Sequence, residues 1–406
     1  MAEGEARVVL KADAADGALA ALLDCITRHG GEPLSVAAAD AGVSVRAVWP
    51  DGDAGYAGAV ACAIELRSGP QASFPGRPLV TTGAVALRST TGSGSTSRVL
   101  PTSRALDVLD ALGTRSAAEL AAAGGDQGVW LIGRELAAWS AARPPLAGAI
   151  VPVNSGVPDV RSLRVDRVAS LANTGAAAGS QSAGALLGQL LAAPAPPLPP
   201  RAPPQLALEK LESAGVGMVA HALVTFEVGP SGGDWPQLQK ALAAIVSAVA
   251  PYRGRLLHAH AAAGASQLEV AIVFGGATDA WTIVSLKAAL ALLLKLSPAE
   301  SSHVSKSGGD SEVAGTDSPT PSPRRRRESR WDESAASCVR DVFVGVASGE
   351  AIVGSVLVGE GAEAQKLDVL AGPCARLARA IAAHARERQT HAAFITSPTQ
   401  RDWRER

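Results

Sequence analysis

Apolar residues along this chain form two kinds of periodic segment: short stretches that alternate with polar residues and longer stretches with helical spacing. In the N-terminal part the alternation predicts strands at Arg7–Lys11, Pro33–Ala38, Val43–Trp49, Leu79–Leu87 and Val129–Ile132. The helical spacing predicts helices at Ala18–Arg28, Tyr56–Arg67 and Ser103–Leu112. Because strands and helices alternate, we expect an α/β or α+β class in which helices cover one side of a mixed sheet.

The same order of elements returns roughly 220 residues later. An Ala-rich helix runs into a glycine, then a strand, a turn, a second strand that ends on an aromatic residue, and another helix. The spacing from Gly31 to Trp49 differs by only about two residues from the spacing between Gly254 and Phe274. The repeat predicts two related domains in one polypeptide, and such pairs can build one site at their shared interface.

The expected first domain spans residues 1–145 and the second spans 206–406. Between them lies a connector, residues 146–205, whose Pro194–Pro204 stretch is typical of a stiff interdomain tether; part of it, Asn154–Asn173, could be structured. The second domain is expected to open with a helix in LALEKLESAG and a strand at Ala222–Val228. An insert at about 297–337 is rich in Ser, Pro, Gly and charge and is predicted not to fold.

Composition narrows the class of function. The chain has 406 residues, 47% of them hydrophobic but only 3% aromatic, and a formal net charge of -1. Because the positive and negative charges nearly cancel, the net charge does not favour binding to nucleic acid. The N-terminus does not resemble a targeting signal, and the longest apolar run is too short for a membrane span, so we expect a soluble cytoplasmic protein.

The four cysteines, Cys25, Cys62, Cys338 and Cys374, form no CxxC pair and show no metal-type spacing to a histidine. We therefore expect small buried thiols in a reducing compartment rather than zinc or redox chemistry. Within the insert, Arg324–Arg327 precede Ser329. This spacing suits a basophilic kinase acting on Ser329, while an ordinary solvated loop is the alternative.

The stretch from Val344 to Ala385 is the most informative short segment. Two apolar strands flank a turn in which Gly349 and Gly354 are placed for chain reversal, and an Ala/Arg helix follows. This resembles the late strand pair and helix of class III nucleotide cyclases, and Thr81–Gly113 is a fainter copy of it. The order of elements is most similar to the tandem catalytic homology domains of soluble adenylyl cyclases.

The resemblance implies two ferredoxin-like βαββαβ domains packed as an intramolecular pseudo-dimer. It implies conversion of ATP to cyclic AMP and pyrophosphate at the domain interface, with two Mg²⁺ (or Mn²⁺) ions. The metal-binding aspartates of the family match Asp13, in VLKAD, and Asp40. Both positions also suit ordinary roles, Asp13 as a helix N-cap and Asp40 as a turn residue. The segment between Asp13 and Gly30 is shorter than is usual in the family.

In the second domain the family supplies base recognition and transition-state groups. The transition-state arginine matches Arg379, or Arg376 in a shifted register, but Ala375 stands where the family has an asparagine. Adenine recognition matches Asp368, and His258 stands in place of the family's lysine. Losing one such group typically costs about 10² to 10³ in turnover, so impaired activity is expected. The alternative is a catalytically inactive cyclase-like module that binds nucleotide or a partner protein.

Overall fold

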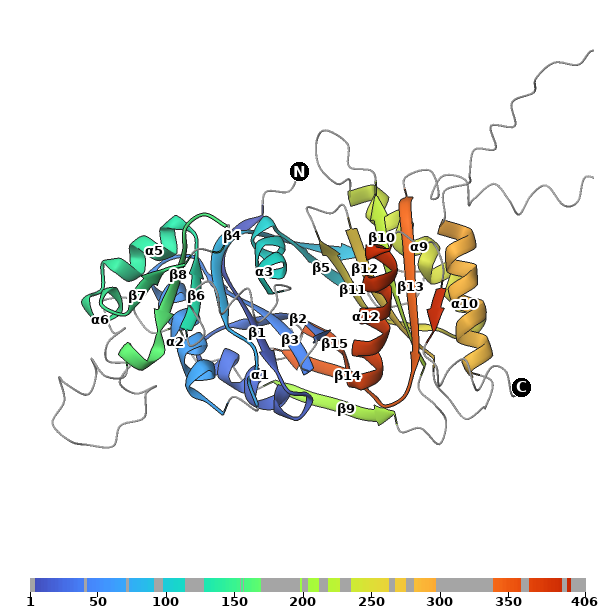
Figure 1. The fold of residues 1–406 in the computed structure, drawn as a ribbon, viewed down its shortest axis with the longest axis horizontal. Coiled ribbons are helices and arrows are strands. Elements are labelled where there is room, and N and C mark those ends of the chain that lie inside the picture. The colour runs from blue at the N-terminus through green and yellow to red at the C-terminus, as the bar shows by residue number, and fades with distance from the viewer. Residues whose placement is uncertain are drawn as a thin grey trace, which may run out of the picture.

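The chain folds into two βαβ-rich halves that lie side by side along the long axis of the molecule (Figure 1). The computed structural model describes residues 4–39, 42–70, 73–90, 98–113, 128–153, 155, 157–168, 198, 204–211, 218–226, 235–262, 267–274, 281–296, 339–358, 365–388 and 393–395. Among these residues, none of the helices combines the length and the apolar character needed to cross a membrane.

The first half is built around a sheet in the order β2-β3-β1-β4-β6-β8-β7, with β5 paired to β4. Its strands are β1 (Glu5–Ala14), β2 (Glu32–Ala39), β3 (Gly42–Pro50), β4 (Leu79–Thr90), β5 (Arg98–Thr102), β6 (Gly128–Ile132), β7 (Ile150–Pro152) and β8 (Val160–Arg164). Its helices are the short 3-10 turn η1 (Asp16–Ala18), α1 (Leu19–Arg28), α2 (Asp53–Ser68), α3 (Arg104–Gly113), α5 (Arg134–Ala141) and α6 (Pro144–Ala147). Strands β7 and β8 extend this sheet beyond residue 145.

The second half has a sheet in the order β11-β12-β10-β13-β16 and a smaller sheet in the order β15-β14-β9. Its strands are β9 (Gln205–Leu211), β10 (Met218–Phe226), β11 (Arg255–Ala262), β12 (Gln267–Phe274), β13 (Val339–Ser348), β14 (Ala351–Val358), β15 (Gln365–Ala371) and β16 (Ala393–Ile395). Its helices are α9 (Trp235–Val249), η3 (Ala250–Tyr252), α10 (Trp281–Leu296) and α12 (Pro373–Glu387).

The main sheets of the two halves share one order of strands. The order β2-β3-β1-β4-β6 of the first sheet corresponds strand by strand to β11-β12-β10-β13-β16 of the second. In both, the pairs around the central strand are antiparallel and the last pair, β4–β6 or β13–β16, is parallel. The mixed α/β class is therefore confirmed, with mostly antiparallel sheets and a βαββαβ element order in each half.

A glycine–aromatic contact explains the spacing that revealed the repeat. A side chain at Gly31 would overlap the ring of Trp49, and one at Gly254 would overlap the ring of Phe274. Both rings are fully buried. Each glycine is therefore needed where the turn after a helix passes over the aromatic residue of the second strand.

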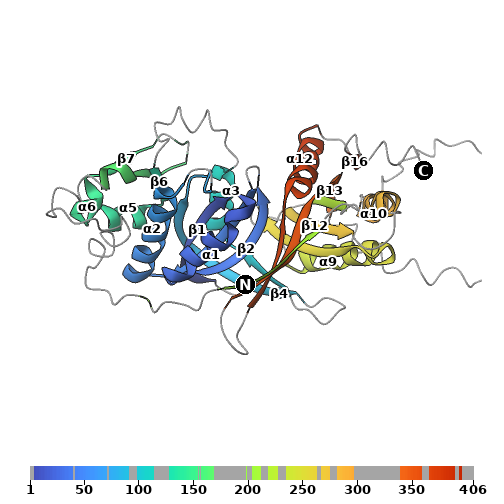
Figure 2. The same ribbon diagram turned by 90° about the horizontal axis from the view of Figure 1, so that it is seen from below.

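Helices lie on both faces of each sheet, not on one side as the sequence predicts. In the second half, α9 and α10 pack on the face that carries Leu268 and Val270, whereas α12 packs on the face that carries Ala271 and Val273 (Figure 2). The first half repeats this arrangement, with α1 and α2 on one face and α3 on the other. Side chains of adjacent strand residues point to opposite faces of the sheet. Because helices cover both faces, both sets of side chains on the central strands are buried.

Two local predictions are wrong. The segment LALEKLESAG, expected as a helix, contains strand β9, because its alternating residues pair with β14. The expected hairpin at Gly349 and Gly354 does not form: β13 and β14 belong to different sheets, and Gly354 lies within β14 opposite Val369 of β15. The insert at 297–337, with Ser329, lies outside the described residues, as does most of the predicted connector.

Candidate functional site

The two halves meet along a seam, by which we mean the contact of η1, α3, β2 and β5 with α12, β11 and β15. The contacts are reciprocal. Strand β15 packs against β2, and β5, its counterpart in the repeat, packs against β11, the counterpart of β2. Apolar residues of β14 and β15, including Val356, Leu367 and Val369, join the hydrophobic core of the first half.

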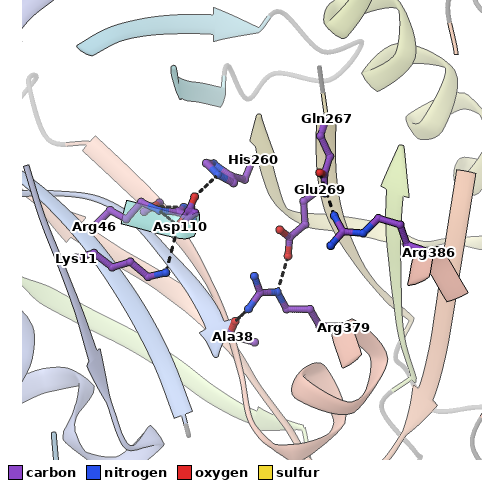
Figure 3. A network of polar contacts seen from close by, with 10 residues as sticks. Lys11, Ala38, Arg46, Asp110, His260, Gln267, Glu269, Arg379 and Arg386 are labelled. Atoms are coloured by element: carbon purple, nitrogen blue, oxygen red, sulfur yellow. Dashed lines mark hydrogen bonds and ion pairs between the residues drawn. The ribbon is translucent and has the colours of Figure 1, made fainter. Parts of the chain in front are cut away.

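A cluster of charged groups lies at the centre of the seam (Figure 3). The Asp110 carboxylate on α3 accepts hydrogen bonds from Arg46 Nη2 at 2.8 Å to both of its oxygens and forms an ion pair with Lys11 Nζ at 3.2 Å. Across the seam, His260 Nε2 on β11 lies 3.2 Å from Asp110 Oδ2. The Arg46 side chain is 7% exposed and that of His260 is 2% exposed.

These contacts lower the pKa values of both Asp110 and His260. Burial disfavours the charged carboxylate of Asp110, but the charge of Arg46, the hydrogen bond from His260 and the charge of Lys11 outweigh it and hold the pKa far below its usual range. Burial, followed by the charge of Arg46, lowers the pKa of His260. His260 is therefore neutral near pH 7 and donates its Nε2 proton to the ionised Asp110.

A second arm of the seam is centred on Arg379 of α12. Its Nε donates to Glu269 Oε1 on β12 at 2.8 Å, and its Nη1 donates across the seam to the backbone oxygen of Ala38 on β2 at 3.2 Å (Figure 3). The Glu269 side chain is only 10% exposed, so this ion pair is mostly desolvated. Arg379 thus joins the two halves while its charge is balanced within its own half.

Asp110 and Arg379 occupy corresponding positions of the repeat. Ala105 on α3 packs against Gly83, and Cys374 on α12 packs against Gly349. Asp110 and Arg379 follow these two contacts at the same spacing along their helices. The seam therefore carries opposite charges at equivalent places, and each reaches the other half.

The turn η1, which follows β1, also contacts the second half. Asp16 in η1 accepts a hydrogen bond from Arg376 Nη1 of α12 at 2.8 Å across the seam. Asp13, near the end of β1, lies on the same face of the strand as Lys11 by alternation. The structure thus pairs Asp16 with Arg376, which the sequence predicted as a site residue, and Asp13 precedes Asp16 by three positions in the chain.

Not every predicted site residue is placed as expected. Asp40 lies outside the described residues, so its relation to Asp13 stays a prediction. Asp368 is half-buried within β15, opposite Ser355 of β14. His258 lies in β11, paired through the backbone with Ala271. Ala375, in the position expected for an asparagine, is 1% exposed and packs in the apolar core beneath α12.

The carboxylate of Asp13 is a suitable ligand for a divalent cation. Its Oδ1 atom is buried and has no hydrogen-bond partner within the described part of the chain. An unpaired buried carboxylate oxygen is costly unless a cation or a donor meets it, and Mg²⁺ prefers such oxygen ligands. The described residues therefore supply one suitable ligand for the metal that the resemblance implies.

The sequence analysis missed Lys11, Arg46, Asp110, His260 and Glu269. For Lys11, Arg46 and Glu269 the signal was a charged residue inside a strand that is otherwise mostly apolar, as in VVLKA, VSVRAVW and QLEVAIVF. Charges in buried strands need partners, so such positions indicate a polar network. Which partner each residue finds depends on contacts between the two halves, and no local pattern encodes them.

No protein-family model matches the chain, and no curated protein matches it either. Among solved structures, the chain is similar to the guanylyl cyclase Cya2, with 11% identity over 46% of this chain and 77% of that one, at a TM-score of 0.27. It is also similar to two structures of a bacterial light-regulated adenylyl cyclase, with 9% identity over 98% of this chain and 87% of each of theirs, at a TM-score of 0.28. At this distance, what the chain does must be argued from its own seam.

Proposed function

We propose that this chain is a cyclase-like protein whose two halves pair as an intramolecular pseudo-dimer and bind ATP with Mg²⁺ at the seam. The observation that carries the proposal is reciprocity. The two halves share one strand order, and the contact of β15 with β2 is matched by that of β5 with β11. Paired α/β units of this kind form ligand sites at their shared interface.

In this proposal each half supplies different groups. Asp13, with Asp40 as the second proposed ligand, would hold the metal, which polarises the reacting oxygens of the α-phosphate when it is bound. His258 and Asp368 would face the adenine. Arg379 would balance the charge of the phosphates, and Arg376 is the alternative. The reaction would yield cyclic AMP and pyrophosphate.

We expect turnover to be low because the cationic groups are already engaged. Arg376 pairs with Asp16, and Arg379 pairs with Glu269, each at 2.8 Å. Either arginine must leave its carboxylate before it can meet a phosphate. The methyl side chain of Ala375 cannot form the hydrogen bond that an asparagine would supply. Each transition-state group that is lost lowers turnover by a factor of about 10² to 10³.

The test combines binding with catalysis. The purified chain is titrated calorimetrically with ATP and with GTP in Mg²⁺ or Mn²⁺, and cyclic nucleotide is measured by mass spectrometry. We expect ATP to bind and Asp13→Ala to weaken binding by at least about tenfold, because a metal ligand is lost. Arg379→Ala should lower any cyclic AMP production by a further factor of about 10².

Arg386→Ala is the matched control, since Arg386 lies on the same helix but is exposed and contacts Gln267. It removes the same charge and should change neither binding nor turnover. If neither nucleotide binds the wild-type chain, or if Asp13→Ala leaves binding unchanged, the proposed nucleotide site is wrong.

A second candidate function is a non-catalytic module that binds a partner protein. It is favoured by Asp16 in the turn after β1, because its carboxylate already accepts a hydrogen bond from Arg376 across the seam. Asp16→Asn separates the two functions. A nucleotide site should gain about tenfold in ATP affinity when this carboxylate is neutralised and Arg376 is released. A pure interaction module should be indifferent to the change.

A further inference from the structure

A compact group of ligand-type side chains lies between α1 and α2, on the face of the first sheet opposite α3. Cys25 of α1 and Cys62 of α2 place their Sγ atoms 3.6 Å apart. Both residues are buried and neither forms a disulfide. The sequence analysis expected inert buried thiols, and their burial is confirmed, but they lie side by side because the two helices pack against each other.

The two thiols have a histidine and a carboxylate beside them. His29 follows Cys25 by one helical turn, and Glu65 follows Cys62 by one turn on the neighbouring helix, so each pair shares one helix face. His29 Nε2 lies 2.8 Å from Glu65 Oε2. Ligand atoms of Cys25, His29 and Glu65 all lie within 4.8 Å of one another. The sequence predicted no metal-type spacing for these cysteines, but the structure places the ligand atoms of Cys25 and His29 together with that of Glu65.

The mutual distances of Cys25, His29 and Glu65 and the distance between the two sulfurs suit a small tetrahedral ion, whereas Cys62 lies outside the group within 4.8 Å and would move toward His29 and Glu65 on binding. Zinc binds thiolate sulfur at about 2.3 Å and imidazole nitrogen at about 2.0 Å, so two sulfurs of one tetrahedron lie roughly 3.8 Å apart. The observed 3.6 Å between Cys25 and Cys62 is close to that value. The contact between His29 and Glu65 is shorter, so these two side chains would separate slightly around an ion.

We propose that Cys25, His29, Cys62 and Glu65 form a structural Zn²⁺ site that fastens α1 to α2. On binding, each thiol releases one proton to solvent, and His29 binds as neutral imidazole through one ring nitrogen. The two thiolates and the carboxylate carry three negative charges, one more than the two positive charges of Zn²⁺. Arg28 Nη1, which lies 3.0 Å from Glu65 Oε1, balances this excess and orients the carboxylate.

Four protein ligands would leave no open position, so the site is structural and not hydrolytic. It lies between α1 and α2, on the face of the first sheet opposite α3, and does not depend on the proposed nucleotide function. The closest alternative use of the same geometry is a dithiol that oxidises to a disulfide. The experiment below separates the two.

The full-length chain is reduced with a phosphine, stripped with a chelator and titrated with Zn²⁺ against a chromophoric competitor, with metal content read by mass spectrometry. We expect one tightly bound Zn²⁺ per chain. Cys25→Ser and Cys62→Ser should each weaken binding by more than about 100-fold, because losing a ligand costs more than losing an outer partner. Arg28→Ala should weaken it by about 10-fold to 100-fold.

Cys374→Ser is the matched control, since Cys374 is a buried thiol on α12 that hydrogen-bonds to the Ala347 backbone oxygen. It should keep full Zn²⁺ binding. Titration with Co²⁺ gives a second readout, a thiolate-to-metal absorption band that should weaken in each single cysteine variant and be lost when Cys25 and Cys62 are both replaced. His29→Gln and Glu65→Gln extend the test to side chains whose replacement preserves bulk, and circular dichroism verifies that every variant is folded.

Three outcomes would overturn the proposal. The reduced wild-type chain could bind no stoichiometric Zn²⁺. Binding could survive replacement of both Cys25 and Cys62. Finally, the reduced chain could reject Zn²⁺ while mild oxidation links Cys25 to Cys62 in peptide mass spectra, which would assign the pair to redox chemistry instead.

Discussion

At the scale of single residues, Asp110 is the group on which the centre of the seam depends. Its carboxylate is surrounded by Lys11, Arg46 and His260, from β1, β3 and β11. A buried cation is tolerated only when it is paired, so removing this one anion leaves two cations and a histidine without their partner.

We predict that Asp110→Asn lowers the free energy of unfolding by about 3 kcal/mol, the cost typical of breaking a buried ion pair. Urea denaturation followed by circular dichroism measures it. The control is Asp166→Asn, which removes a carboxylate paired with Arg164 at an exposed position and should cost less than about 1 kcal/mol. Equal losses in the two variants would contradict the role assigned to Asp110.

A second residue-scale prediction concerns pH. Because the pKa of His260 is lowered in the folded chain, the unfolded chain takes up this proton at a higher pH than the folded chain does. The stability contributed by neutral His260 is therefore complete above about pH 6.5 and is lost as the pH falls below that value. The lowered pKa of Asp110 acts in the same direction at still lower pH.

The measurement compares urea midpoints at pH 8 and pH 5.5. Wild-type chain should lose more stability on acidification than His260→Gln does. His384→Gln, which changes an exposed histidine on α12, should behave like wild type. An identical pH response in all three chains would show that His260 is not buried as a neutral group.

At the scale of elements, the strand pair β14–β15 joins the second half to the core of the first. Leu367 of β15 is 7% exposed and belongs to that core, whereas Leu357 of β14 is 38% exposed. We predict that Leu367→Ala costs about 2 to 4 kcal/mol of unfolding free energy, through lost burial and the cavity that remains. Leu357→Ala should cost less than about 1 kcal/mol. Similar values for both would place this strand pair outside the core.

Apolar spacing along the sequence predicts some of the helices and strands but not those that depend on tertiary pairing. The periodicity of the first half predicted β1, β2, β3, α1, α2 and α3 closely, because each depends on apolar spacing within one segment. The segment before β10, LALEKLESAG, was predicted as a helix. It became strand β9 because β14 offers it hydrogen-bonding partners, and tertiary pairing overrides local propensity.

At the scale of the whole molecule, the reciprocal seam predicts that neither half is complete alone. Without the second half, the first loses the buried residues that β14 and β15 contribute to its core. We predict that residues 1–168 and 198–406, produced as separate chains, form a stable complex when co-expressed, because the exposed apolar surface is complementary.

Affinity capture through a tag on one half, followed by size-exclusion chromatography, measures this complex. Asp110→Asn combined with Arg379→Ala should reduce recovery of the untagged half, because both contacts that cross the seam at equivalent positions are lost. Halves that are separately folded and monodisperse, with no affinity for each other, would contradict the pairing.

The sequence by itself determined most of the local elements and the spacing of the two glycine–aromatic pairs, because apolar periodicity and these pairs arise from contacts between near neighbours. Only the tertiary structure decided which charges neutralise one another, since Asp110 meets His260 across 150 positions and Arg379 meets Ala38 across 341. It also decided that Cys25 lies beside Cys62. Such contacts form when packed elements bring distant segments together, and one-dimensional periodicity carries no record of them.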